Sequence, residues 1–219
     1  MALDIKICGL KTADALAAAL AGRESHIGFI FFPKSPRNIS PDDAGRLRNA
    51  ALGKAKAVAV TVDATDTFLD EIVNAMSPDM LQLHGSETPE RVAAVKKRYG
   101  LPVMKALSVS QAADLEAVKP YIGIADLFLF DAKPPKGADR PGGNGVSFDW
   151  RLLQGIAENT DYLLSGGLDA ANVADALRLA NPPGIDISSG VESAPGVKDP
   201  ALIDAFFRAV RVASENRAA

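Results

Sequence analysis

Residues 57–63 read AVAVTVD, residues 65–76 read TDTFLDEIVNAM, and residues 80–84 read MLQLH. The first and last of these segments are short apolar runs that end on a polar residue, which is typical of buried β-strands. Between them, Thr65 or Asp66 precedes a stretch with the apolar spacing of a helix. A strand, a helix and a second strand in this order predict two parallel strands joined by a helical crossover.

The same alternation continues along the chain. Apolar runs of strand length, each followed by glycine, serine, proline or aspartate, occupy residues 3–8, 26–32, 57–62, 80–84, 103–107, 125–131, 162–165 and 185–188. Helix-start signals stand between these runs and after the last one, at Thr12, Ser40, Thr65, Thr88, Ser110, Asp169 and Asp199. We count eight strand–helix repeats in the 219 residues.

Eight repeats predict an α/β fold, a single-domain (β/α)8 TIM barrel at the compact end of its size range. A doubly wound open sheet is the alternative, because periodicity alone does not show that a sheet closes. The chain has no linker, low-complexity segment or block of charge that would divide it. We therefore expect residues 1–219 to form one domain.

The composition is that of an ordinary folded protein, with 47% hydrophobic and 23% charged residues. This excludes intrinsic disorder, collagen-like repeats and a disulfide scaffold. Lys and Arg number 24 against 27 Asp and Glu, a net charge of −3. The bulk charge therefore does not recruit nucleic acid or an anionic membrane, and any bound anion must be held by local geometry.

Cysteine and histidine are rare in this chain. Cys8 is the single cysteine, which excludes an internal disulfide, and His26 and His84 are the two histidines, too few for a multi-histidine metal site. Asp4 and Lys6 interrupt the N-terminal apolar residues, so we expect no signal peptide. No apolar run reaches the length of a membrane span, and we expect a cytoplasmic protein.

Ligands of such folds bind at the carboxyl ends of the strands, so the residues that end the apolar runs are candidates for chemistry. Cys8 ends the first run, and the period of two places it on one face with Asp4 and Lys6. The other face, Ile5 and Ile7, is apolar and suits the helix layer. We therefore expect Cys8 to point inward at the rim, with Lys6 favouring its thiolate form. The alternative is a small buried side chain without a chemical role.

Asp131 ends residues 125–131, a run with almost no other polarity. Burial disfavours the charged form of a carboxyl group, which suits a general acid. The alternative is an aspartate that caps a helix or a loop. His84 follows the fourth run at the same rim. It is either a ligand contact or a satisfied structural histidine, and without a second histidine nearby we expect no metal there.

Two glycine-rich segments follow the last two runs: residues 165–167 read SGG and residues 188–190 read SSG. Glycines leave backbone N–H groups open to a ligand, and a helix N-terminus adds about half a positive charge. Phosphate sites of barrels are often built from the loops after strands seven and eight. We expect a phosphate group to bind to Gly166, Gly167, Ser189 and Gly190.

Two other segments bear on ligand binding. Arg37, in residues 34–40 (KSPRNIS), is either a surface arginine or a guanidinium fork for a carboxylate. Residues 132–144 hold three prolines, and PGGNG at residues 141–145 is rich in glycine. This stretch is either a mobile lid or a solvated loop.

Seven groups of sequence strings carry a resemblance to a known family. They are KICG at 6–9, GFIF at 28–31 with SPR at 35–37, QLHG at 82–85, FD at 130–131, GGNGVSFDW at 142–150, SGGL at 165–168, and DISSGVE at 186–192 with PGVKD at 195–199. In this order, and over nearly the whole chain, they resemble the phosphoribosylanthranilate isomerases of tryptophan biosynthesis. The sequence departs from the family pattern at Asn144, where Thr or Ser is usual, and in the proline-rich residues 133–141.

The resemblance implies a (β/α)8 barrel that needs no cofactor and no metal and carries out an Amadori rearrangement of N-(5'-phosphoribosyl)anthranilate. It implies that Cys8 is the general base and Asp131 the general acid. It also implies four residues that contact the substrate: Arg37, His84, Gly143 and Gly145. Of these, Arg37 contacts the anthranilate end. The phosphate would lie against the loops after strands six, seven and eight.

The implied partner is a small phosphosugar substrate, and we expect the protein to bind neither nucleic acid nor a membrane. We expect it to be a monomer or a homodimer. One competing hypothesis is another phosphosugar-barrel isomerase or epimerase, although a metal-dependent epimerase needs more histidines than this chain has. The other is a non-catalytic sugar-phosphate binding protein. Such a protein would have no reason to keep both Cys8 and Asp131 at the rim.

Overall fold

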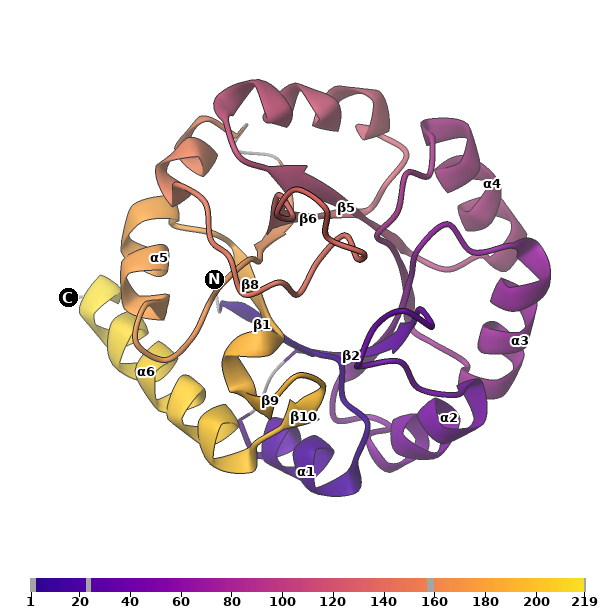
Figure 1. Cartoon of the computed structure of the whole chain (residues 1–219), viewed down its shortest axis with the longest axis horizontal. Helices are drawn as coiled ribbons and strands as arrows, with labels where there is room; N and C mark the ends of the chain where they lie inside the picture. The colour runs from indigo at the N-terminus through magenta and orange to yellow at the C-terminus, as the bar shows by residue number, and fades with distance from the viewer. Residues whose placement is uncertain (1–2, 23–24, 157–159, 219) are drawn as a thin grey trace.

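Eight parallel strands form a closed barrel in the computed structural model, which describes residues 3–22, 25–156 and 160–218 (Figure 1). The strands follow one another around the ring in chain order, and β8 pairs with β1. Their bounds are β1 Asp4–Cys8, β2 His26–Phe31, β3 Lys56–Thr61, β4 Met80–Leu83, β5 Val103–Val109, β6 Leu127–Ala132, β7 Tyr162–Leu164 and β8 Gly184–Ile187. The predicted barrel is therefore confirmed, and the open sheet is wrong.

Helices surround the barrel on the outside (Figure 1). They are α1 Ala13–Ala21, α2 Pro41–Ala50, α3 Asp66–Met76, α4 Pro89–Tyr99, α5 Val173–Ala180 and α6 Pro200–Ala218, with the 3-10 helices η1 Ala112–Tyr121, η2 Trp150–Gly155 and η3 Ser189–Val191. A short antiparallel hairpin follows η3, made of β9 Glu192–Ala194 and β10 Val197–Lys198. Within the described ranges, none of the helices combines the length and the apolar character that crossing a membrane requires.

Side-chain caps start four of the helices where the sequence predicts them. The hydroxyl groups of Thr12, Ser40, Thr65 and Thr88 each accept a hydrogen bond from the backbone N–H three residues later. The helix α3 is therefore capped by Thr65 and not by Asp66. Such caps satisfy N–H groups that have no partner inside the helix.

Two of the expected repeats lack an α-helix. After Ser110 the chain forms the 3-10 helix η1, in which Asp114 accepts hydrogen bonds from the backbone N–H groups of Ser110 and Gln111 and Pro120 has no N–H to donate. Between β6 and β7, the described residues form a long loop and the 3-10 helix η2. Proline and glycine are poor helix formers, which accounts for the loop over residues 133–149.

A buried ion pair lies inside the barrel. Inward-facing apolar side chains form one cluster: Cys8, Val58, Val60, Met80, Met104, Ala106, Leu129 and Leu163. On β1 and β8, Lys6 Nζ donates to Asp186 Oδ1 at 2.8 Å, and Ser165 Oγ donates to Asp186 Oδ2 at 3.0 Å. Lys6 is fully buried. An unpaired charge in such a place costs several kcal/mol, so the pairing is what allows both charges inside the barrel.

Candidate active site

A cavity of about 750 Å³, including its open mouth, lies at the carboxyl ends of the strands. Nine of the predicted site residues line it: Cys8, Arg37, His84, Asp131, Gly143, Gly145, Gly166, Gly167 and Ser189. They come from several different strands and loops, so the closure of the barrel brings distant parts of the sequence together. The tenth, Gly190, does not line the cavity. Its Cα lies against the carbonyl of Leu168, where a side chain has no room.

Cys8 is at the inner end of this cavity, and the expected inward orientation is observed. The thiol is buried, and Gly28 on the next strand leaves room for it, since a Cβ there would lie 2.9 Å from Cys8 Sγ. Burial raises the pKa of Cys8, while the ammonium groups of Lys6 and Lys198 lower it and Asp186 raises it. The expectation that Lys6 favours the thiolate has the right sign, but burial outweighs it.

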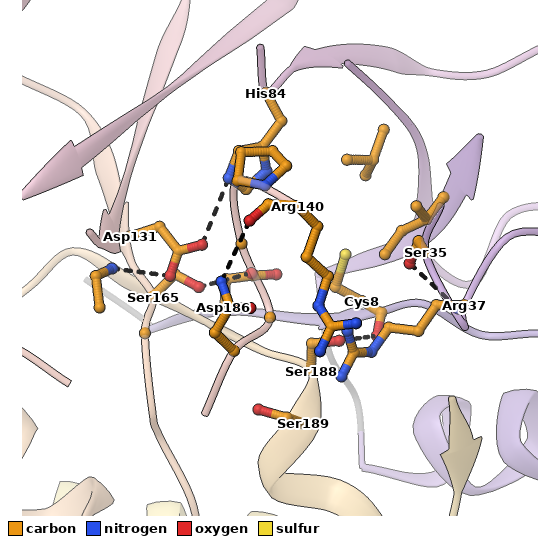
Figure 2. Close-up of a pocket in the computed structure, with 18 of the residues that line it drawn as sticks. Cys8, Ser35, Arg37, His84, Asp131, Arg140, Ser165, Asp186, Ser188 and Ser189 are labelled. Carbon is orange, nitrogen blue, oxygen red and sulfur yellow. Dashed lines mark hydrogen bonds and ion pairs between the residues drawn. The ribbon is translucent and has the colours of Figure 1, made fainter. Parts of the chain in front are cut away.

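Asp131 faces the cavity from β6, beside His84 (Figure 2). Its Oδ1 accepts a hydrogen bond from the N–H of Ala132 at 2.9 Å, and its Oδ2 lies 3.4 Å from His84 Nε2. His84 Nδ1 in turn lies 3.1 Å from the amide nitrogen of Gln82. With Gln82 donating to Nδ1, the ring proton is assigned to Nε2, which is buried near Asp131 but forms no hydrogen bond with it. Asp131 thus caps no helix, and His84 is at once held by Gln82 and open to the cavity.

The guanidinium group of Arg37 is buried and already paired. Its Nε donates to Glu192 Oε1 at 2.7 Å and its Nη2 to Glu192 Oε2 at 2.8 Å. The two-pronged fork predicted for a ligand carboxylate is therefore filled by the protein itself. The third nitrogen, Nη1, faces Gly143 and remains on the cavity side. Arg37 is neither a surface arginine nor an open fork.

Lys198 shares the carboxylate of Glu192. Its Nζ lies 2.6 Å from Glu192 Oε1 and also donates to the carbonyl of Ser188 at 2.9 Å. Burial alone would raise the pKa of Glu192, but the hydrogen bond from Arg37 and the charge of Lys198 bring it down to about 2. Burial lowers the pKa of Lys198 to about 8 in spite of Glu192. The β9–β10 hairpin is thereby fastened to the loop after β2.

The loop after β6 lies over the end of the barrel (Figure 1), and its residues 140–146 line the cavity. Gly142 stands over Asp131 and His84, where a Cβ would lie 3.0 Å from His84 Nε2. Gly143 stands over Arg37 Nη1, and Gly145 is next to Ser189 Oγ, 3.9 Å from where a Cβ would be. This placement is the one that a lid requires.

The glycine-rich loops after β7 and β8 lie under the far end of the same lid. Gly166 and Gly167 have φ of +92° and +65°, and the position of a Cβ on Gly167 is 2.8 Å from the backbone of Val146. Ser189 begins η3, which is only three residues long, and α5 begins well after Gly167. The positive potential expected here therefore comes from loop N–H groups more than from a helix N-terminus.

Several residues that shape the site were not predicted from the sequence: Asp186, which pairs with Lys6, and Gln82, Arg140, Ser188, Glu192 and Lys198. Gln82 carries a usable signal, because strand alternation places it on the same inward face as His84. The partners Glu192 and Asp186 lie far away in the sequence, so no local pattern reveals them. Within the described ranges, no group of three or more His, Cys, Asp or Glu side chains is arranged to hold a metal ion.

A family model described as N-(5'phosphoribosyl)anthranilate (PRA) isomerase matches residues 5–209. The chain belongs to the N-(5'-phosphoribosyl)anthranilate isomerase family. The isomerase of that name from Mesorhizobium japonicum is 76% identical to this chain over 219 residues, which is 100% of both proteins. The one from Brucella canis is 69% identical over 210 residues, 96% of this chain and 95% of the relative.

Solved structures of phosphoribosylanthranilate isomerases have the same fold. The enzyme from Thermotoga maritima superposes with a TM-score of 0.86 at 31% identity, over 96% of this chain and 100% of the relative. Another, in complex with reduced 1-(o-carboxyphenylamino)-1-deoxyribulose 5-phosphate, has a TM-score of 0.83 at 29% identity over the same shares of the two chains. The family resemblance expected from the sequence strings is confirmed.

Proposed function

We propose that this protein isomerises N-(5'-phosphoribosyl)anthranilate in tryptophan biosynthesis, with Cys8 as general base and Asp131 as general acid. The assignment of this reaction rests on membership of the family. One observation carries the two roles. Cys8 on β1 and Asp131 on β6 face the same cavity, with β7 and β8 between them in the ring. A small substrate between them has an acid on one side and a base on the other.

The acid step opens the sugar ring. Asp131 gives its proton to the ring oxygen of the furanose, the bond from C1 to that oxygen breaks, and the lone pair of the anilino nitrogen forms an iminium with C1. Asp131 Oδ2 is suited to this because Oδ1 is held by the N–H of Ala132 and Oδ2 is turned to His84 and the cavity. The lid over Asp131 keeps water from the iminium.

The base step completes the rearrangement. The Cys8 thiolate removes the proton from C2, and the electron pair of that C–H bond forms the C1–C2 double bond as the iminium becomes an enamine. The enamine then tautomerises, with a proton moving from the C2 hydroxyl to C1, and leaves a ketone. Because burial raises the pKa of Cys8, the charges of Lys6 and Lys198 are what make the thiolate accessible.

Substrate contacts follow the lid. Arg37 Nη1 serves the anthranilate end, His84 meets the substrate beside Asp131, and Gly143 and Gly145 allow the lid to approach the substrate closely. We assign the phosphate to loop groups whose N–H or hydroxyl faces the cavity: Gly166, Gly167 and Ser189. Gly190 contributes by allowing the loops after β7 and β8 to pack together.

Turnover of freshly made phosphoribosylanthranilate by the purified protein tests this function. We expect loss of substrate and formation of 1-(o-carboxyphenylamino)-1-deoxyribulose 5-phosphate. A different phosphosugar isomerase would leave this substrate unchanged and act on another. A sugar-phosphate binding protein would bind it and form no product.

We further propose that the chain is a single domain that works in the cytoplasm as a monomer or a homodimer. The closed ring of eight strands supports one domain. A phosphorylated biosynthetic intermediate is retained inside cells, which supports the cytoplasm. A structure of monomers generated from the dimeric isomerase of Thermotoga maritima, 30% identical to this chain, leaves both oligomeric states open. Sedimentation analysis distinguishes them.

A further inference from the structure

Arg140 is a cationic side chain at the cavity that the reaction scheme does not use. It lies in the loop after β6, lines the cavity and is half-buried. Its Nε is buried and has no hydrogen-bond partner, and among the described residues its guanidinium forms no ion pair. A buried donor without an acceptor is costly, so such a group is usually satisfied by a ligand or by water.

Arg37, which the family resemblance places at the anthranilate end, already shares its charge with a carboxylate of the protein, Glu192. Of its five N–H donors, Glu192 takes the one on Nε and one on Nη2, and Nη1 faces Gly143 of the lid on the cavity side. A carboxylate has two oxygens with about four lone-pair directions, and its strong complexes with arginine use two parallel hydrogen bonds. Glu192 holds the Nε–Nη2 edge of Arg37, so a ligand carboxylate reaches Arg37 from the Nη1 side, and a second arginine there would supply a further pair of donors and a second positive charge.

The lid crosses the cavity from the Asp131 side, and the direction of the Arg140 side chain indicates which end of the cavity it serves. The lid passes over Asp131 at Gly142 and over Arg37 at Gly143, and only later does it reach Ser189 at Gly145. The glycine loops assigned to the phosphate are under this later part. In Figure 2 the Arg140 side chain extends from the lid in the direction of Arg37. Arg140 therefore belongs with the anthranilate end and not with the phosphate.

We propose that Arg140 binds the anthranilate carboxylate together with Nη1 of Arg37, so that two arginines form one carboxylate clamp. The proposal rests on the proposed function, because it takes the ortho-carboxylate of that substrate as its ligand. Arg140 is a binding residue and takes no part in proton transfer. Since it is carried by the lid, a substrate with the carboxylate also holds the lid over Asp131.

Binding of two reduced product analogues tests the clamp. One is reduced 1-(o-carboxyphenylamino)-1-deoxyribulose 5-phosphate, and the other is the same compound with a plain phenylamino group. Dissociation constants are measured by calorimetry for the wild type, Arg140→Gln, Arg140→Lys and the control Lys136→Gln, an exposed cation of the same loop. Thermal melts check that each variant is folded.

We expect Arg140→Gln to raise the dissociation constant of the carboxylated analogue about 10- to 100-fold, the usual effect of losing a charge-assisted hydrogen bond. The dissociation constant of the plain analogue should rise less than about 3-fold. Arg140→Lys should lose less affinity for the carboxylated analogue than Arg140→Gln does, and Lys136→Gln should bind both analogues as the wild type does. Equal weakening of both analogues would place Arg140 on the phosphate and overturn the proposal. Unchanged binding in Arg140→Gln, or an equal loss in Lys136→Gln, would also overturn it.

The proposed function is judged separately, on the wild type alone. Wild-type protein that neither turns over phosphoribosylanthranilate nor binds the carboxylated analogue contradicts the proposed function. Wild-type protein that does both, with Arg140→Gln indistinguishable from it, contradicts only the role of Arg140.

Discussion

Replacing Gly142 with alanine adds one methyl group between the lid and the proposed acid. The φ of Gly142 is outside the left-handed region, so alanine is compatible with its backbone. The added Cβ would lie 3.0 Å from His84 Nε2 and closer still to Asp131 Oδ2, whereas ordinary contacts begin at 3.4 Å. Either the lid rises or Asp131 moves, by roughly 1 Å. A displacement of that size at a reacting group costs about 100-fold in rate, or about 2.7 kcal/mol of activation free energy.

We therefore expect Gly142→Ala to lower kcat about 100-fold in initial-rate assays with phosphoribosylanthranilate, with little change in the thermal melt. Gly137→Ala is the matched control. Gly137 is in the same loop with a φ of +86°, and a Cβ there has nothing within 4 Å. It strains the loop by about 1–2 kcal/mol without a clash, and its kcat should stay within about 3-fold of the wild type. A wild-type kcat in Gly142→Ala, or equal losses in the two variants, would refute the placement of the lid over Asp131.

Three further predictions concern the base, the interior and the anion contacts. Cys8→Ala should lose about 10²–10⁴-fold in kcat and stay folded. Because only the thiolate is a base, wild-type kcat/KM should rise with pH until the raised pKa of Cys8 is passed. A pH profile without this rise contradicts the assignment of Cys8 as the base. Lys6→Met leaves Asp186 buried without its partner and should lower the free energy of unfolding by about 3–5 kcal/mol in urea titrations, whereas combining it with Asp186→Leu should restore most of that loss. Arg37→Ala should raise KM several-fold to about 100-fold, and Ser189→Asp should weaken inhibition by inorganic phosphate; equal inhibition of Ser189→Asp and wild type would place the phosphate elsewhere.

The strands and most helix starts could be predicted because their causes are local. An apolar run such as residues 57–62 forms a buried strand because of its own composition, whichever strands it pairs with. A threonine such as Thr65 caps the helix that begins at the next residue. The inward direction of Cys8 follows from alternation along a single strand. Closure of the barrel is not local, but eight repeats of one unit favour it.

The hydrogen bonds and the pKa of each site residue depend on partners that lie far away in the sequence. The sequence leaves Arg37 as either a surface arginine or an open fork for a ligand, and the structure instead fills the fork with Glu192, which is 155 residues away. The strength of the thiol Cys8 as a base depends on how deeply it is buried as well as on Lys6 beside it. The missing α-helix after β6 could be suspected from the prolines of the loop, but where its lid lies requires the packed barrel.

The kinetics of Asp131→Asn test the central claim most directly. Asparagine is nearly the same size as aspartate and can still donate a hydrogen bond to the ring oxygen, but it has no acidic proton to transfer. With Asp131 as the acid, kcat falls at least about 100-fold, while the dissociation constant of reduced 1-(o-carboxyphenylamino)-1-deoxyribulose 5-phosphate changes much less. Retention of most of kcat in Asp131→Asn, or loss of binding with kcat intact, would contradict general acid catalysis by Asp131.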